Sequence, residues 1–553
     1  MMKTKQKTAK RQNKKNALRI KIIALALAVI LVAGGVLAFV FTRPETIQIA
    51  ARTDIIKHWN EQGITNYFEA ELGLRVKWID YGTDTYTRLQ EDLGKEPKDL
   101  PDAYLGMGLD SRQLEALVAQ SSFLELSDSY VNAYAPNLRD IINADTSRRD
   151  EMLFQGKLYS LPSLNEQYAE EYPQKAWINN DWLVRAKLEM PDSPQELLEV
   201  LRVFKTSDLN GNGKQDEVPL GAAYKDTANG STFGFLISAF VTTDFDLTAT
   251  NYINVGGDGK LYAGSVQPGF KDALAYLNTI YRENLVDATV FEQSTSVFLN
   301  GSKAQEKYGV ILAKDLGAIM NDTERASNYL PLAPLKNGEQ SSTFVKRTAI
   351  KTGGFLIPNR IDEERQILAL KFGDAMLSQG GTLTVCYGNE NVGWFAADNS
   401  TLAMGAQRST WRLAPQAVDG TLIYSGLLGE VPYWLSAGRQ MERQATAPTN
   451  GALPSLQTKE NWAGYMNKVT KEYYEPVGLL NLQNALPELT PSAQEELDYS
   501  GVIDAMTEGA RAFVTGKRDL ATQWDAYIAE LNERGLNDIL EAIQRAYDQS
   551  VTE

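Results

Sequence analysis

Short apolar runs alternate with longer amphipathic segments along most of the chain. The short runs are typical of buried strands, and the longer segments repeat their apolar residues every three or four positions, as helices do. This alternation predicts an α/β fold with mainly parallel sheets. Strands are expected at residues 46–50, 75–79, 309–313 and 354–358. Helices are expected at residues 113–119, 194–206, 268–284 and 363–378.

The carboxyl-terminal segment carries a further helical pattern. Gly535 follows this pattern as a stop signal, and a second helix is expected at residues 537–548. An apolar stripe on a helix usually faces the core, so the side chains of the stripe are predicted to pack inside the protein. They are Leu520, Trp524, Tyr527, Ile528 and Leu531.

The amino-terminal segment has the pattern of a membrane helix. Residues 22–41 are twenty residues without a charged side chain, which is long enough to span a bilayer. The first 44 residues contain ten Lys or Arg and no Asp or Glu, and the basic residues lie mainly before the apolar run. Residues 1–21 are therefore expected to stay in the cytoplasm as a basic tail, with the rest of the protein outside.

The length of the apolar run favours an uncleaved transmembrane anchor over a cleaved signal segment, whose apolar core is about 7 to 15 residues long. A cleaved and secreted form is the alternative. A lipid anchor would need a cysteine just after the apolar run, whereas the only cysteine of the chain is Cys386. The sequence therefore predicts a protein tethered to the extracytoplasmic face of the cell membrane by one helix.

The exported part, residues 45–553, is strongly acidic. It contains 45 Lys or Arg and 70 Asp or Glu, a net charge of −25. A surface of this sign repels nucleic acid, so no nucleic-acid partner is expected. One cysteine allows no internal disulfide, so the core must stabilise the exported part, and its length suggests two or three domains.

Residues 208–217 place oxygen-bearing side chains at every second position around a glycine. Counted from Asp208, acidic and amide side chains occupy positions 1, 3, 5 and 9, with Gly213 at position 6. Lys214, at position 7, can offer its backbone carbonyl, as in a calcium loop. Position 12, which is Glu in an EF-hand, is Pro219 here, so the bidentate carboxylate would come from Glu217.

This segment has a second interpretation as an Asn/Gly-rich turn, because Asn, Asp and Gly are common in turns. The spacing favours calcium, with a structural role in fixing the connection between a helix and a strand. The predicted ligands are Asp208, Asn210, Asn212, Lys214 through its carbonyl, Asp216 and Glu217.

Short motifs are spread in order over nearly all of the exported part. They lie at residues 99–103 (DLPDA), 156–162 (GKLYSLP), 177–183 (WINNDWL), 276–278 with 283–287 (YLN and ENLVD), 387–394 (YGNENVGW) and 513–518 with 524–527 (FVTGKR and WDAY). With the calcium-like loop, their order and spacing resemble the family 1 extracellular solute-binding proteins of bacterial ABC importers, in particular the LplA-like group of Gram-positive bacteria.

This resemblance implies a periplasmic-binding-protein-like fold. Two α/β lobes are joined by a hinge, and the ligand lies in the cleft between them, which closes as the lobes approach. One lobe is expected mostly in residues 45–165 with part of 310–430, and the other mostly in 166–310 with the carboxyl-terminal helices. The family also carries a calcium loop at this place, and all six predicted ligands match it. Many relatives have a lipid-modified cysteine near the amino terminus, which this chain lacks.

Many members of this family bind oligosaccharides and deliver them to an ABC permease, so the resemblance implies a sugar ligand and a permease partner. Aromatic rings suit the C–H faces of a sugar, and amides, carboxylates and guanidinium groups suit its hydroxyls. Each candidate has the alternative of packing in the core. The candidates are Trp177, Tyr387, Trp394 and Trp434 as rings, with Asn179, Glu390 and Arg412 as polar partners.

The sequence offers little for catalysis, and no enzyme is predicted. His58 is the sole histidine and Cys386 the sole cysteine. Cys386 is expected to be a small buried residue and not a nucleophile. Phosphate-binding and dinucleotide-binding glycine motifs do not occur. Two alternatives stay open: a glycoside-processing enzyme, because paired carboxylates leave no clear sequence signal, and a membrane-tethered sensor that presents its ligand to a signalling partner.

Overall fold

The computed structural model describes most of residues 44–552. The described residues are 44–144, 147–154, 156–166, 172–224, 233–242, 253–256, 258–304, 306–314, 316, 328–338, 340–341, 344–345, 350–397, 401–405, 407–414, 430–446, 461–479, 493 and 496–552.

The first lobe is built on a six-stranded sheet with the order β17-β4-β14-β3-β1-β2. Ile47 and Ile49 of β1 are fully buried. They belong to the core of this lobe, to which the helices α2, α3, α16 and α17 also contribute buried side chains. The strands are β1 (Glu45–Ala51), β2 (Leu74–Asp80), β3 (Ala103–Leu105), β4 (Ser160–Asn165), β14 (Ile350–Leu356) and β17 (Tyr433–Leu435). The helices are α2 (Thr53–Glu61), α3 (Ile64–Leu72), α16 (Glu363–Leu377) and α17 (Gln379–Tyr387).

The second lobe is built on a four-stranded sheet with the order β10-β5-β9-β6. Helix α11 (Pro194–Thr206) shows why the local sequence folds as it does: Ser193 caps it, Pro194 opens it, and Leu201 and Phe204 are fully buried in the core of this lobe. The strands are β5 (Ala176–Asn179), β6 (Val218–Gly221), β9 (Tyr308–Leu312) and β10 (Tyr329–Pro331).

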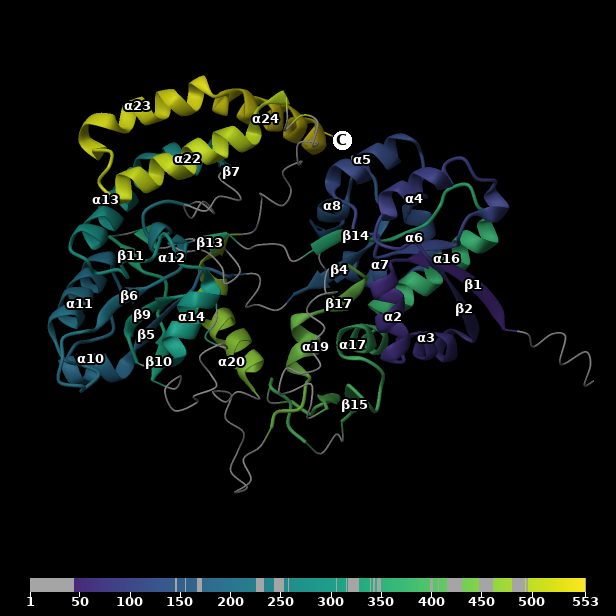
Figure 1. Ribbon diagram of the computed structural model, residues 1–553, viewed down its shortest axis with the longest axis horizontal. Coiled ribbons are helices and arrows are strands. Elements are labelled where there is room, and N and C mark those ends of the chain that lie inside the picture. The colour runs from purple at the N-terminus through teal and green to yellow at the C-terminus, as the bar shows by residue number, and fades with distance from the viewer. Residues whose placement is uncertain are drawn as a thin grey trace, which may run out of the picture.

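Three carboxyl-terminal helices complete the second lobe (Figure 1). They are α22 (Tyr499–Val514), α23 (Leu520–Glu533) and α24 (Leu536–Thr552), and α22 lies against α13 (Pro268–Arg282). The Asn278 side chain of α13 fixes this contact by donating to the carbonyls of Phe513 and Val514, at 3.1 and 3.0 Å. Trp524, Tyr527 and Leu531 are buried, so the predicted apolar stripe packs inside the protein.

The remaining elements are short. The helices are α4 (Thr85–Asp92), α5 (Ser111–Ala119), α6 (Asp128–Tyr134), α7 (Pro136–Ala144), α8 (Ser147–Met152), α10 (Asn180–Ala186), α12 (Gly234–Ile237), α14 (Thr295–Ala304), α19 (Ala437–Met441), α20 (Trp462–Val469) and the π-helical turn η3 (Thr470–Tyr474). The 3-10 turns are η1 (Pro97–Asp99), η2 (Gly264–Val266) and η4 (Glu475–Val477). Paired strands are β7 (Ile253–Val255) with β8 (Leu261–Ala263), β11 (Lys336–Asn337) with β12 (Gln340–Ser341), β13 (Phe344–Val345) with β18 (Gly478–Leu479), and β15 (Trp394–Ala396) with β16 (Trp411–Leu413).

The predicted strands and helices are confirmed within a few residues, but the sheets are mixed and not mainly parallel. In the first sheet β1 runs parallel to β2 and β3, and β17 runs parallel to β4, whereas β14 is antiparallel to both neighbours. In the second sheet β5 is antiparallel to β9 and β10. Strand β14 enters the first sheet only after the chain has built the second.

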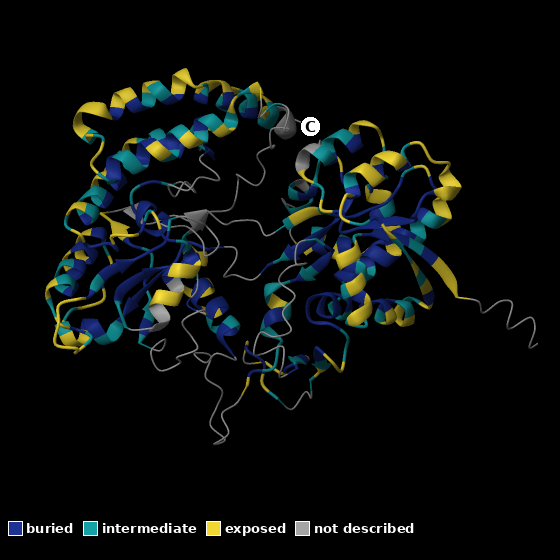
Figure 2. Cartoon of the chain, viewed as in Figure 1, coloured by how far each residue is buried: buried dark blue, intermediate teal, exposed yellow. Residues whose placement is uncertain are grey.

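The described chain passes between the two sheets three times: from β4 to β5, from β10 to β14, and from the β17–α19 segment to α20. Figure 1 shows the two sheets side by side, with β4, β14 and β17 on the side of the first lobe that faces the second. Figure 2 shows that the strands of both sheets are mostly buried, whereas the helices around them have both buried and exposed residues. Each lobe is therefore discontinuous in sequence.

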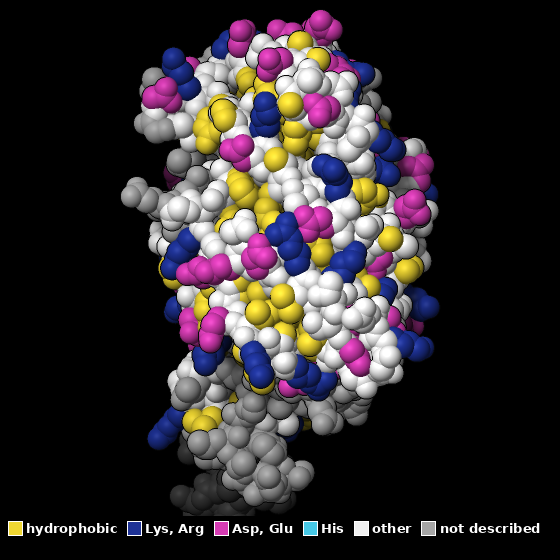
Figure 3. Space-filling model, turned by 90° about the vertical axis from the view of Figure 1, so that its left-hand side faces the viewer, with side chains coloured by type: hydrophobic (Ala, Val, Ile, Leu, Met, Phe, Trp, Pro, Cys, Tyr) yellow, Lys and Arg dark blue, Asp and Glu magenta, His cyan; other side chains and the backbone are white. Residues whose placement is uncertain are grey.

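On the face of the second lobe in Figure 3, Lys and Arg lie interspersed with Asp and Glu. Within the described ranges, we find no helix that is both long and apolar enough to cross a membrane. The membrane segment predicted at residues 22–41 lies outside these ranges.

Candidate functional site

Two neighbouring parallel strands of the first sheet end at the side that faces the second lobe (Figure 1). They are β4 and β17, with Leu164 opposite Trp434, and the chain leaves them at Glu166 and Ser436. The Glu166 amide donates to the Leu435 carbonyl at 2.9 Å, which keeps the two ends together. In α/β proteins ligands bind outside the carboxyl ends of strands, so this edge is a candidate binding site.

A half-buried indole, Trp434, is fixed at this edge. Its Nε1 donates to Oε2 of Glu166 at 2.9 Å, and Glu166 also forms an ion pair with Arg148 of α8. The Arg439 guanidinium lies 4.3 Å from the centre of the Trp434 ring and donates to the Trp434 carbonyl at 2.6 Å. A rigid aromatic ring with charged groups around it suits the apolar and polar parts of a sugar.

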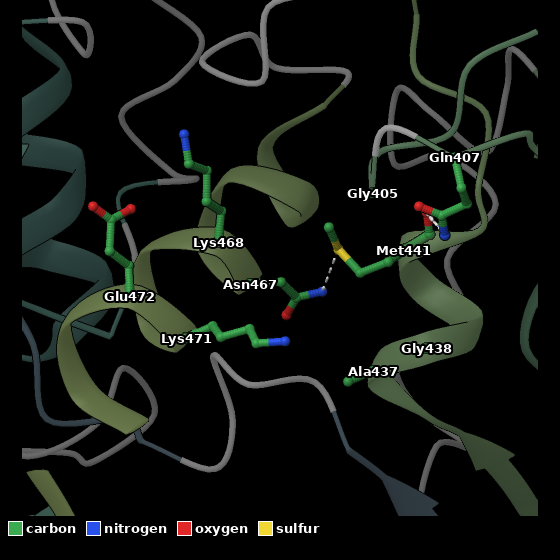
Figure 4. A pocket seen from close by; sticks show the side chains of 9 residues that line it. All are labelled: Gly405, Gln407, Ala437, Gly438, Met441, Asn467, Lys468, Lys471 and Glu472. Carbon is green, nitrogen blue, oxygen red and sulfur yellow. Dashed lines mark hydrogen bonds between the residues drawn. The ribbon is translucent and has the colours of Figure 1, made fainter. Parts of the chain in front are cut away.

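A pocket of about 470 Å³ lies next to this edge, between α19 and α20. Helix α19 follows β17 directly, and Figure 4 shows α19 and α20 on opposite walls. The Lys471 side chain extends towards α19, whereas the Glu472 carboxylate points away from it (Figure 4). The lining residues are Gly405, Gln407, Ala437, Gly438, Met441, Asn467, Lys468, Lys471 and Glu472.

Asn467 is the deepest polar group of this pocket, with 2% of its surface exposed. Its Nδ2 donates to the Met441 sulfur at 3.7 Å across the pocket (Figure 4). Its Oδ1 is buried and has no hydrogen-bond partner. A buried amide oxygen without a donor is costly, so this oxygen suits a ligand that supplies one.

The candidates Trp177 and Asn179 lie in the core of the second lobe. Trp177 is fully buried, donates from Nε1 to the Ala313 carbonyl at 2.9 Å and lies against Trp462. Asn179 caps α10 through the Trp182 amide, at 3.1 Å, and donates to Glu306 at 2.6 Å. Both side chains are occupied by structural contacts in this structure, which favours the alternative that they pack in the core.

The candidates Tyr387 and Trp394 lie in the core of the first lobe. Tyr387 packs against Trp411, with ring centres 5.7 Å apart. Trp394 is 7% exposed and donates from Nε1 to Oγ1 of Thr384 at 3.3 Å. Gly393 permits this placement, because a Cβ there would lie 1.6 Å from the Tyr387 carbonyl oxygen. These rings also have core positions, which favours the alternative of packing in the core.

The candidates Glu390 and Arg412 are half-buried near the β15–β16 pair, where the Arg412 guanidinium lies 4.1 Å from the centre of the Phe395 ring. The structure thus gathers four of the candidates around α17 and this strand pair, places two in the second lobe, and leaves Trp434 at the edge between the lobes. Glu166, Arg148 and Asn467 were not singled out from the sequence, in which they carry no motif.

The segment 208–217 forms a compact loop around its oxygens. Gly211 and Gly213 have φ of 72° and 81°, in the left-handed region that glycine permits. The Asp208 carboxylate accepts from the amides of Asn212 and Gly213 at 3.1 and 2.9 Å. Hydrogen bonds from the side chains of Asn210 and Asn212 lower the pKa of Asp216.

Glu217 is the buried end of this loop, with 7% of its surface exposed. Its Oε1 accepts from the amides of Leu209 and Asn210, at 2.6 and 3.0 Å, whereas its Oε2 is buried without a hydrogen-bond partner. A buried carboxylate oxygen without a partner fits a bound cation. No group of three or more His, Cys, Asp or Glu suited to a metal occurs in the described part, but this loop combines carboxylates with amides and a carbonyl.

Cys386 lies inside the first lobe. Burial raises the pKa of its thiol to about 12, which keeps the thiol protonated at neutral pH. This position agrees with a small buried residue and not with a nucleophile.

Comparison with known proteins reveals relatives over nearly the full chain, although no family model matches. The chain is 26% identical over 507 residues to the fructooligosaccharide ABC transporter substrate-binding protein FusA of Streptococcus pneumoniae serotype 4 (strain ATCC BAA-334 / TIGR4). This alignment covers 89% of the chain and 87% of FusA.

Solved structures give the same fold. FusA in complex with kestose aligns with a TM-score of 0.61 at 21% identity, over 92% of this chain and all of FusA. An EF-hand mutant of FusA in complex with fructo-nystose aligns over the same shares with a TM-score of 0.57 at 22% identity. An HMO-binding, ABC-transporter-associated solute-binding protein of Bifidobacterium longum infantis ATCC 15697 aligns with a TM-score of 0.70 at 16% identity, over 92% of this chain and 99% of that protein. The chain therefore has the two-lobed fold of these solute-binding proteins, and its sequence is similar over nearly its full length to that of the ABC transporter substrate-binding protein FusA.

Proposed function

We propose that the protein is the extracytoplasmic substrate-binding component of an ABC importer and that it binds an oligosaccharide between its lobes. The observation that carries this proposal is the similarity to FusA, because it extends over 89% of the chain and includes both lobes. The Trp434 edge and the neighbouring pocket provide a ring, charged groups and an unpaired amide oxygen between the two sheets.

Lobe closure is the proposed way in which the ligand is held. The lobes are joined by three chain connections, so one can rotate against the other while both sheets stay intact. A ligand that contacts both lobes stabilises the closed form, because closure adds contacts that the open form lacks. The closed, loaded form is the one that a permease would recognise.

The function can be tested by thermal unfolding of residues 45–553 with a panel of fructooligosaccharides, other oligosaccharides, amino acids and peptides. One class of oligosaccharide is expected to raise the melting temperature, since a ligand at a hundredfold excess over its Kd adds about 2.7 kcal/mol of stability. Amino acids and peptides serve as controls. A shift with peptides alone would contradict the proposal, and appearance of cleaved sugar would favour a glycoside-processing enzyme.

We also propose that residues 208–217 bind a structural calcium ion. The ligands would be Asp208, Asn210, Asn212, Lys214 through its carbonyl, Asp216 and Glu217. The ion would supply the missing partner of the buried Glu217 oxygen and join the end of α11 to the start of β6. The EF-hand mutant of FusA supports this proposal for the relatives.

Residues 22–41 are proposed to remain uncleaved and to tether the protein beside its permease. Mass spectrometry of the protein from its native membrane should then detect peptides from the basic tail, and the protein should stay with the membrane after a high-salt wash. A mature amino terminus near residue 39, with the protein in the medium, would contradict the anchor but leave sugar binding intact.

A further inference from the structure

The pocket between α19 and α20 joins elements that belong to different lobes. Helix α19 is held by the first lobe: the Arg439 guanidinium donates to the Leu377 carbonyl at 3.0 Å, and the Trp411 indole donates to the Arg439 carbonyl at 2.8 Å. Leu377 and Trp411 both belong to the core of the first lobe. The α19 wall of the pocket therefore moves with the first lobe.

Helix α20 is held by the second lobe. Its first residue, Trp462, packs on Trp177 of β5 with ring centres 5.9 Å apart. At the end of η3, the Tyr474 hydroxyl donates to the Leu332 carbonyl at 3.0 Å. The α20 wall is therefore packed on the second lobe, so a rotation that moves this lobe away from α19 widens the pocket.

Two polar side chains of the α20 wall point towards α19. Asn467 and Lys471 are four residues apart on this wall, and Figure 4 shows both side chains directed across the pocket, with Glu472 turned away. The π-helical turn η3 begins at Thr470 and includes Lys471, and such turns occur frequently at functional sites. The Asn467 Oδ1 offers an acceptor without a partner, and Lys471 brings a positive charge to the same wall.

We infer that the pocket between α19 and α20 is a subsite for one sugar unit, with Asn467 as a specificity-determining residue that accepts a hydrogen bond from a sugar hydroxyl. This inference rests on the proposed function and assigns the ligand to named residues. Asn467 and Lys471 bind the unit from the second lobe, and the Met441 and Ala437 side chains contact its apolar surface from the first. Occupation of the subsite thereby joins the two lobes.

The test replaces Asn467 by Leu in residues 45–553 and measures two quantities: the Kd of the oligosaccharide found with the panel, and the melting temperature without ligand. The Kd is expected to rise about tenfold or more, because a site built for a hydroxyl loses at least one hydrogen bond. The melting temperature is expected to stay or to rise, because the substitution removes a buried oxygen without a partner.

The matched control is Thr470→Val, which alters another fully buried polar group on the same helical segment but does not line the pocket. It should leave the Kd unchanged. An unchanged Kd in Asn467→Leu, whatever its melting temperature, would overturn the subsite while sugar binding stands. If Asn467→Leu does not fold, the Kd is measured with Asn467→Ala, which removes the same oxygen without added volume. An unchanged Kd in that variant would likewise overturn the subsite. Absence of binding to any oligosaccharide by the unsubstituted protein would overturn the proposed function as well.

Discussion

Chelation of calcium is expected to lower the melting temperature of the exported part by roughly 5–10 °C. A cation bound only by the folded state at a hundredfold excess over its Kd stabilises that state by about 2.7 kcal/mol, and each kcal/mol corresponds to about 2–4 °C for a lobe of this size. Differential scanning calorimetry with excess calcium and with EGTA measures the difference. The second lobe should respond, because the loop connects its α11 to its β6.

The substitution Glu217→Gln separates calcium binding from other effects of the chelator. This variant should melt at a lower temperature in calcium and should lose most of the response to EGTA, because the buried carboxylate is gone. Glu189→Gln is the control, since Glu189 is an exposed carboxylate outside the loop. Equal melting curves of the unsubstituted protein with and without EGTA would sink the calcium proposal.

Replacement of Trp394 by Ala is expected to destabilise the first lobe by about 3–5 kcal/mol, the range for removing a large buried aromatic side chain. Trp394 is 7% exposed, packs in the core and donates a hydrogen bond to Thr384, so its loss leaves a cavity and removes that hydrogen bond. Chemical denaturation followed by circular dichroism measures this loss. Trp394→Phe fills most of the space and should recover a large part of the stability.

Trp434→Ala provides the contrasting variant. The Trp434 ring is half-buried at the edge between the lobes, so its loss should cost less stability and should weaken oligosaccharide binding about tenfold, in the range of one stacked ring. A normal melting temperature of Trp394→Ala together with lost sugar binding would contradict the assignment of Trp394 to the core.

The sequence predicts best where the signals are local. Helix α11 has the predicted bounds because Pro194 opens it and its apolar residues repeat at helical spacing over the whole segment. The direction of β14 was not predictable in this way, since it depends on where the chain returns from the second lobe. An apolar run has the same appearance in a parallel and an antiparallel strand.

The binding residues were harder to identify, for a related reason. The residue type of Trp177 suits a sugar platform and a core position equally, and its role is set by Ala313 and Trp462, which are distant in sequence. Asn467 has no distinguishing feature in the sequence, because only folding places its side chain in a pocket, with its Nδ2 opposite Met441 and its Oδ1 without a partner. The proposed calcium ligands could be named from the sequence, because all their oxygens lie within ten consecutive residues.

The late entry of β14 and β17 into the first sheet has a consequence for the order of synthesis. Strand β14 lies between β3 and β4, so residues 45–165 have no complete sheet until residue 356 has been made. The sheet receives its last strand only at residue 435. The amino-terminal lobe is thus the first to emerge from the ribosome but cannot be completed before the central part of its neighbour has been translated, so the two lobes fold during the same late stage of synthesis and not one after the other.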